Sequence, residues 1–148
     1  MTPRAPETLL QTFRTGSVAG LFPVSLRQLQ WWDERQLISP EHIGHARQYT
    51  VEQLFQIGIV ADLRRKGISL QRLHELVRWL NKSLHQGSLK VDPEREAYLL
   101  LTGKRFTVRL TAASLIEAAT NSREPLFMVD LRDIARRVVG HEEERRFA

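Results

Sequence analysis

Residues 24–37, Val-Ser-Leu-Arg-Gln-Leu-Gln-Trp-Trp-Asp-Glu-Arg-Gln-Leu, decide how the first half of the chain folds. Ser25 and Gln28 have the Ser-x-x-Gln spacing of a capping box, in which two side chains satisfy two backbone amides at the start of a helix. Pro23 favours a turn just before this helix, because proline lacks an amide hydrogen and biases the preceding residue away from helical conformation. We therefore predict a short helix over residues 17–21, a turn, and a second helix that begins at Ser25.

The second helix has an apolar and a polar face. Leu26, Leu29 and Trp32 recur at helical spacing, so we expect them to face inward. Trp31 is adjacent to Trp32 and cannot share its face, so we expect it to be partly exposed. The side chains expected to face outward are Arg27, Gln28 and Gln30.

Two further helices follow a segment of turn-forming residues. Residues 38–49 have no helical period and predict a loop or a short hairpin. Thr50 begins a Thr-x-x-Gln capping box, and the apolar face of a third helix runs from there to Gly67. Ser69 caps a fourth helix, which ends before a linker at residues 87–93.

The second half of the chain has a different character. Residues 98–101 and 105–110 read as strands separated by Thr-Gly-Lys, which is a hairpin signal. Thr111 can cap a helix, residues 126–129 form a short apolar strand, and Asp130 can cap a last helix that ends at Val139. The predicted unit is β-β-α-β-α, and the predicted fold class is α+β.

These elements predict a division of the chain. Residues 1–86 form an N-terminal, mostly helical domain, which begins with a loose lead-in and one helical turn around Leu9, Leu10 and Phe13. Residues 94–140 form a small α+β domain for dimerisation or for binding an effector or partner. Residues 141–148 are a charged, flexible tail.

The composition narrows the function. The chain of 148 residues contains no cysteine, which excludes disulfides, thiolate metal sites and a cysteine nucleophile. We recognise no phosphate-binding glycine loop and no nucleophile–base set, so we expect neither an enzyme nor a cofactor. There is no secretory signal and no apolar run long enough for a membrane, which predicts a bacterial cytoplasmic protein associated with the nucleoid.

The net charge of +5 suits an anionic partner, and most of it lies in the N-terminal half. Residues 1–86 hold 11 Lys and Arg against 7 Asp and Glu, whereas residues 87–148 hold 11 against 10. A helix after a turn, with polar side chains at its start, can read base edges in the major groove of duplex DNA. The side chains that we expect to contact DNA are Ser25, Arg27, Gln28, Gln30, Trp31, His45, Arg47, Gln48, Tyr49 and Lys66.

The combined spacing over residues 17–73 resembles the MerR family of winged helix-turn-helix regulators. Residues 29–34, Leu-Gln-Trp-Trp-Asp-Glu, lie where that family has Leu-Arg-Tyr-Tyr, or the same motif with Trp, followed by an acidic residue. Residues 47–49, Arg-Gln-Tyr, match the Arg-x-Tyr of its wing, and the later apolar positions follow in register. Three positions depart from the family pattern, where arginine is replaced by Gln30 and glycine by Gln36 and Pro23. The resemblance implies a transcriptional regulator that binds specific duplex DNA.

Several residues have a second interpretation. Arg47 can pair with Glu41 or Asp33 instead of DNA, and Tyr49 can be a core anchor of the wing. Lys66 belongs to a basic helix end that can serve as a C-terminal cap. The pair His42 and His45 could bind a metal, but no third ligand is recognisable, so backbone contact with DNA is favoured.

Alternatives also exist for the whole protein. It could be an excisionase-like architectural factor, or an autoregulating antitoxin-type protein whose C-terminal unit binds a protein partner. A small-molecule or protein effector at that unit is also possible. Because Gly87 and Pro93 end the fourth helix early, a long coiled coil is excluded, and we expect a homodimer formed by the C-terminal unit.

Overall fold

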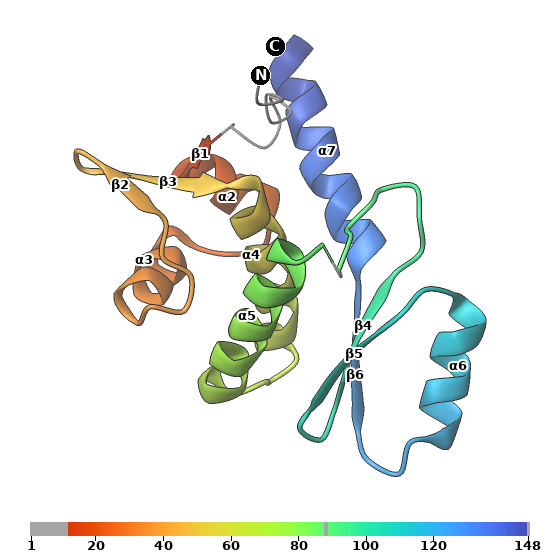
Figure 1. The fold of residues 1–148 in the computed structure, drawn as a ribbon. Helices are drawn as coiled ribbons and strands as arrows, with labels where there is room; N and C mark the ends of the chain where they lie inside the picture. The colour runs from red at the N-terminus through yellow and green to blue at the C-terminus, as the bar shows by residue number, and fades with distance from the viewer. Residues whose placement is uncertain (1–11, 88, 148) are drawn as a thin grey trace.

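The computed structural model describes residues 12–87 and 89–147 and has an α+β fold, as predicted (Figure 1). It contains two three-stranded antiparallel sheets, with the strand orders β1-β3-β2 and β5-β4-β6. Along the chain the elements are β1 (Thr12–Arg14), α2 (Thr15–Leu21), α3 (Leu26–Glu34), β2 (Glu41–Ile43), β3 (Ala46–Thr50), α4 (Val51–Arg65), α5 (Leu70–His85), β4 (Tyr98–Thr102), β5 (Arg105–Arg109), α6 (Ala112–Asn121), β6 (Leu126–Asp130) and α7 (Leu131–Phe147).

The first sheet corrects the prediction for the start of the chain. Phe13 lies in strand β1, opposite Tyr49 of β3, and not in a helical turn. The strand satisfies the backbone of this segment through β3 and buries the Phe13 side chain, which is 1% exposed. Leu9 and Leu10 lie outside the described residues. The predicted short hairpin is present as β2 and β3.

Both predicted capping boxes are confirmed. The Ser25 Oγ accepts from the Gln28 amide at 3.0 Å, and the Gln28 Oε1 accepts from the Ser25 amide at 3.0 Å. Thr50 and Gln53 form the same pair of bonds at 3.2 and 2.9 Å at the start of α4. Each box satisfies two amides that have no partner within the helix, and so sets where the helix begins.

Helix α3 uses a narrower apolar face than predicted. Leu29 and Trp32 are buried, as expected, and Trp31 is 36% exposed, also as expected. Leu26, predicted to face inward, is instead 57% exposed. The reason is helical geometry, because six residues advance the side chain by about 600°, which leaves Leu26 roughly 120° away from Trp32 around the axis.

Helix α4 is the centre of the molecule, and Gly58 explains how it is packed on several sides. A Cβ added at Gly58 would lie 2.7 Å from the Phe22 ring and 3.0 Å from Ile134 of α7. Glycine weakens a helix by about 1 kcal/mol relative to alanine. Here it allows the turn before α3 and the last helix to pack directly on the α4 backbone.

The C-terminal unit has the predicted order of elements. The second sheet aligns Leu99 and Leu101 of β4 with apolar residues of both neighbouring strands, and this face packs against the helices of the N-terminal part. Asp130 caps α7, as predicted, through a bond of 3.2 Å to the Asp133 amide. Helix α7 then runs past Val139, where we expected it to end, to Phe147, and it packs along α4 (Figure 1). None of the helices within the described ranges combines the length and apolar character needed to cross a membrane.

Candidate nucleic-acid interface

The start of helix α3 presents polar side chains to solvent. Arg27, Gln28 and Gln30 are exposed, as predicted, and Ser25 and Gln28 also form the capping box. The Gln28 Oε1 accepts from the Ser25 amide, while the Gln28 Nε2 has no bond to another described residue. The Gln30 Nε2 donates to the Glu34 Oε1 at 3.0 Å within the helix. The exposed end of α3 thus keeps both a guanidinium and an amide group free to face a ligand.

Strands β2 and β3 and their turn, residues 41–50, form a wing beside α3 (Figure 1). Gly44 has a φ of +64° at the turn, a left-handed conformation that glycine adopts without a steric penalty. Ile43 next to it is 55% exposed, and His45 is exposed. The tip of the wing therefore projects into solvent with an imidazole and an apolar side chain.

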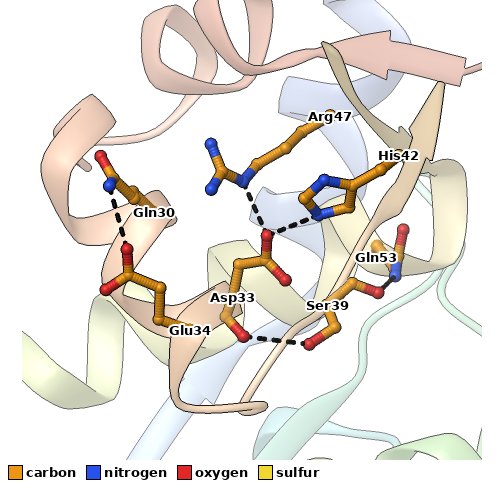
Figure 2. A network of polar contacts seen from close by, with 7 residues as sticks. All are labelled: Gln30, Asp33, Glu34, Ser39, His42, Arg47 and Gln53. Carbon is orange, nitrogen blue, oxygen red and sulfur yellow. Dashed lines mark hydrogen bonds and ion pairs between the residues drawn. The ribbon is translucent and has the colours of Figure 1, made fainter. Parts of the chain in front are cut away.

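Asp33 connects the wing to helix α3. Its Oδ2 accepts from the Arg47 Nε at 2.7 Å and lies 2.8 Å from the His42 Nε2 (Figure 2). The Asp33 side chain is 11% exposed, whereas those of Arg47 and His42 are 25% and 50% exposed. A carboxylate that is largely removed from water thus receives two bonds from one hairpin, so the hairpin and α3 keep a defined relative position.

The same contacts shift the pKa of the Asp33 carboxyl. Burial raises the pKa of this carboxyl, but the hydrogen bonds from Arg47 and His42, together with their charge, outweigh burial and lower the pKa below its ordinary value. Asp33 is therefore ionised at neutral pH. Within the described residues, no group of three or more His, Cys, Asp or Glu side chains could hold a metal ion.

A second set of bonds ties the loop between α3 and the wing to helix α4. The Ser39 Oγ donates to the Asp33 backbone oxygen at 3.3 Å, and the Gln53 Nε2 donates to the Ser39 backbone oxygen at 2.9 Å (Figure 2). Gln53 is also the last residue of the α4 capping box. The start of α4, the loop and α3 are thereby linked in one chain of polar contacts.

Arg47 retains hydrogen-bonding capacity beyond Asp33. Only its Nε faces the carboxylate, and its two terminal nitrogens turn away from Asp33 (Figure 2). The pairing with Asp33, one of the two interpretations of Arg47, therefore leaves a fork of donors available for an anion. Gln48 is half-buried and its Oε1 accepts from the Thr12 hydroxyl at 2.5 Å.

Two exposed arginines near this surface were missed from the sequence. Arg14 lies on β1 opposite Gln48, and it was missed because residues 1–15 gave no strand signal. Arg35 stacks on Trp31, with its guanidinium carbon 4.9 Å from the ring centroid. The four-residue spacing between Trp31 and Arg35 was the signal that could have revealed this contact.

Two predicted contact residues lie elsewhere. Tyr49 is fully buried, so the structure places it as the core anchor of the wing, and its hydroxyl has no partner within the described residues. The Lys66 Nζ bonds Asp62 at 2.8 Å and the Met128 backbone oxygen at 2.5 Å. Lys66 thus joins α4 to the edge of the second sheet.

Gln36 occupies an unusual backbone conformation between α3 and the wing. Its φ is +58°, in the left-handed region that glycine prefers and that costs other residues roughly 1 kcal/mol. This is the position at which the resemblance noted above has glycine. The departure in sequence therefore changes the residue and keeps the glycine-like turn.

A helix after a turn, followed by a braced β hairpin, defines a winged helix-turn-helix module. Residues 13–79 match the family model described as MerR HTH family regulatory protein. The N-terminal module thus matches the DNA-binding module of MerR-family transcription regulators, and the resemblance seen in the sequence is confirmed. No curated protein matches the chain.

Proposed function

We propose that this protein is a sequence-specific transcriptional regulator that binds duplex DNA with α3 in the major groove and the wing on the flanking backbone. The observation that carries the proposal is the pair of contacts from the Asp33 carboxylate to Arg47 and His42, which we call the Asp33 brace. This brace holds α3 and Arg47 in one orientation while donors of both remain exposed. Arg27, Gln28 and Gln30 are assigned to base edges. Arg47, His45 and Trp31 are assigned to phosphates or the minor groove.

The remaining predicted contacts receive smaller roles. Ser25 and Gln48 are assigned to phosphates, because the Ser25 hydroxyl hydrogen and the Gln48 Nε2 are donors that the capping box and the Thr12 contact do not use. Arg14 and Arg35 extend the same surface with two more cations. Tyr49 anchors the wing in the core and Lys66 bonds Asp62 and Met128, so neither is assigned to DNA.

The proposal includes a homodimer formed through helix α6. No residue of this ten-residue helix is buried, and Ile116 is 64% and the preceding Leu110 68% exposed. Glu117 is its only charged residue, so a two-fold copy meets little like charge. The free edge of β5 is a poorer interface, because antiparallel self-pairing about Thr107 would place Arg105 against Arg109 of the copy.

A dimer of this kind would place two α3 helices on one face of DNA and would require an inverted repeat. Such a regulator would act on the nucleoid in the cytoplasm. An antitoxin-type partner is the second candidate for α6, because the same exposed apolar side chains would suit another protein.

Selection of duplexes from a random library, followed by anisotropy titrations at several salt concentrations, tests the proposal. We expect an enriched inverted repeat and an affinity that falls steeply with salt, with a log–log slope of about −0.9 per phosphate contacted. An enriched sequence without salt dependence, or binding without any enriched sequence, would contradict a sequence-specific regulator. An architectural factor would instead bend DNA with little enrichment.

A further inference from the structure

A cleft of about 920 Å³ is lined by residues of the second sheet and of the segment before and into α5, and none of its lining residues belongs to α3 or the wing. One wall is formed by Ile68, just before α5, and by Arg72 in its first turn. The other wall is the hairpin turn between β4 and β5, together with residues 122–127. The volume falls within the range of roughly 300–1,000 Å³ that small-molecule sites have in proteins.

The floor of the cleft is apolar and its rim is basic. Ile68 and Leu101 are buried and Phe127 is half-buried, so the lining offers a hydrocarbon surface. Around it stand four cationic side chains and one acidic side chain, which are Arg72, Lys104, Arg105, Arg123 and Glu124. Since the rest of the C-terminal half is nearly neutral, this concentration of positive charge is local.

Arg72 lines the cleft with a guanidinium that is largely buried and only partly paired. Its side chain is 16% exposed and lies over the Phe106 ring, 4.7 Å from the centroid. Its Nη1 is 3.6 Å from Glu75, a long ion pair, and its Nη2 is buried without a hydrogen-bond partner among the described residues. A partly paired guanidinium that lines the cleft favours an anion as a further partner.

We propose that this cleft binds a small organic anion with an apolar body, whose carboxylate or similar group pairs with Arg72 and whose hydrocarbon part packs on Leu101 and Phe127. The combination of a basic rim and an apolar floor favours this class over inorganic anions and over neutral apolar molecules. Because the ligand would contact both α5 and the second sheet, it would stabilise their contact. The binding itself does not depend on the proposed DNA function.

Three probes separate the need for a negative charge from the need for a hydrocarbon chain in calorimetric titrations of the full-length chain. Octanoate carries both the charge and the hydrocarbon, 1-octanol carries only the hydrocarbon, and inorganic phosphate carries only the charge. We expect octanoate to bind at least tenfold more tightly than either of the others. Equal binding of octanol, or of phosphate, would overturn the proposed ligand class.

Substitutions then locate the site. We expect Arg72→Gln to weaken octanoate at least tenfold, and Arg123→Gln, at the exposed rim, to weaken it about threefold without disturbing the fold. Arg78→Gln on the exposed side of α5 is the matched control and should change nothing. Octanoate affinity that is unchanged in both pocket variants would overturn the site. Absence of octanoate binding by the parent protein would overturn it as well. In that case, a lower duplex affinity of Arg123→Gln would show that the basic rim contacts DNA instead.

Discussion

The Nε of Arg47 lies 2.7 Å from the Oδ2 of Asp33, and this ion pair joins the wing to helix α3. The pair uses only one of the three nitrogens of the guanidinium. The same arginine can therefore fix the wing and donate to a phosphate at the same time. Pairing with Asp33 and contact with DNA, which look like alternatives in the sequence, are compatible in the structure.

Asp33→Asn should weaken DNA binding without unfolding the protein. A neutral amide loses both charge-assisted bonds, so the wing is held less firmly, and we expect a loss of about 1 kcal/mol in unfolding free energy and several-fold in duplex affinity. Urea unfolding and fluorescence anisotropy measure the two effects. Glu34→Gln is the control, because this neighbouring carboxylate bonds only Gln30 of the same helix, and an equal effect of both variants would argue against the brace.

The acid side of the stability profile should depend on Asp33. Because contacts lower its pKa in the folded state, the unfolded chain binds this proton more readily. The brace therefore stabilises fully above pH of about 4, the ordinary pKa of the group, and is lost as the pH falls through the folded value. We expect Asp33→Asn to lose less stability than the parent between pH 5 and pH 2, on the order of 1 kcal/mol, and parallel profiles would contradict this.

Gln28 and Arg47 should affect DNA binding in different ways. Gln28→Ala should relax sequence preference by about 1–3 kcal/mol, since a glutamine amide can bond an adenine edge. Arg47→Ala should weaken specific and random duplexes alike. Competition titrations with operator and random DNA distinguish the two.

Gln28→Glu is the control for the capping role of Gln28. A glutamate keeps an acceptor for the Ser25 amide and removes the Nε2 donor, so it should preserve helix stability and lose sequence preference. If Gln28→Glu retained the preference, the effect of Gln28→Ala would come from the cap. If Arg47→Ala changed base preference and Gln28→Ala did not, the roles of α3 and the wing would be reversed.

Gln36→Gly should stabilise the protein. The φ of +58° is free of steric cost for glycine, so we expect a gain of about 0.5–1 kcal/mol in unfolding free energy, partly offset by the greater freedom of glycine in the unfolded chain. Thermal and urea unfolding measure it. Gln36→Ala shares the Cβ of glutamine and should give no gain, so a stabilised alanine variant would point to another cause.

Tyr49→Phe should leave DNA binding unchanged. Its hydroxyl is buried without a partner, so removing it should keep or raise the unfolding free energy by up to about 1 kcal/mol at pH 7. Tyr98→Phe, which loses a bond of 3.0 Å to Glu96, should not gain stability. Weaker duplex binding by Tyr49→Phe would show that the hydroxyl reaches the DNA backbone.

Tyr49 should also shape the alkaline profile. Burial raises the pKa of Tyr49 to about 12, so the folded state keeps its proton while the unfolded state loses it above a pH of about 10. The stability from this difference is complete below pH 10 and is lost as the pH rises toward 12. Tyr49→Phe should lose less stability over this range than the parent, and an unchanged slope would contradict the burial of the ring.

Ile116→Glu should convert the dimer to a monomer. A carboxylate in the centre of the α6 face must be desolvated on association, so we expect the dimer dissociation constant to rise at least about tenfold, as measured by sedimentation. Leu26→Glu, at a similarly exposed leucine on α3, should leave the dimer intact. A parent protein that is monomeric at high concentration would remove the premise.

Local chemistry was enough to predict most elements of this protein. The capping boxes at Ser25 and Thr50, the turn at Pro23 and the hairpin around Gly103 depend on residues close together in sequence, so their spacing carries the signal. The same holds for the family of the N-terminal module, because its apolar and polar positions follow a regular register. Arg27 and Gln30 could be placed on an exposed helix face for the same reason.

Contacts between distant segments were decided only by tertiary structure. The strand at Phe13 exists because β3 offers a free edge, and the Lys66 ammonium is bound by the Met128 backbone oxygen from the second half of the chain. Gly58 is unfavourable within its own helix, yet Phe22 and Ile134 require it. Burial and pairing of this kind depend on the whole packed chain, and no local pattern of residues contains them.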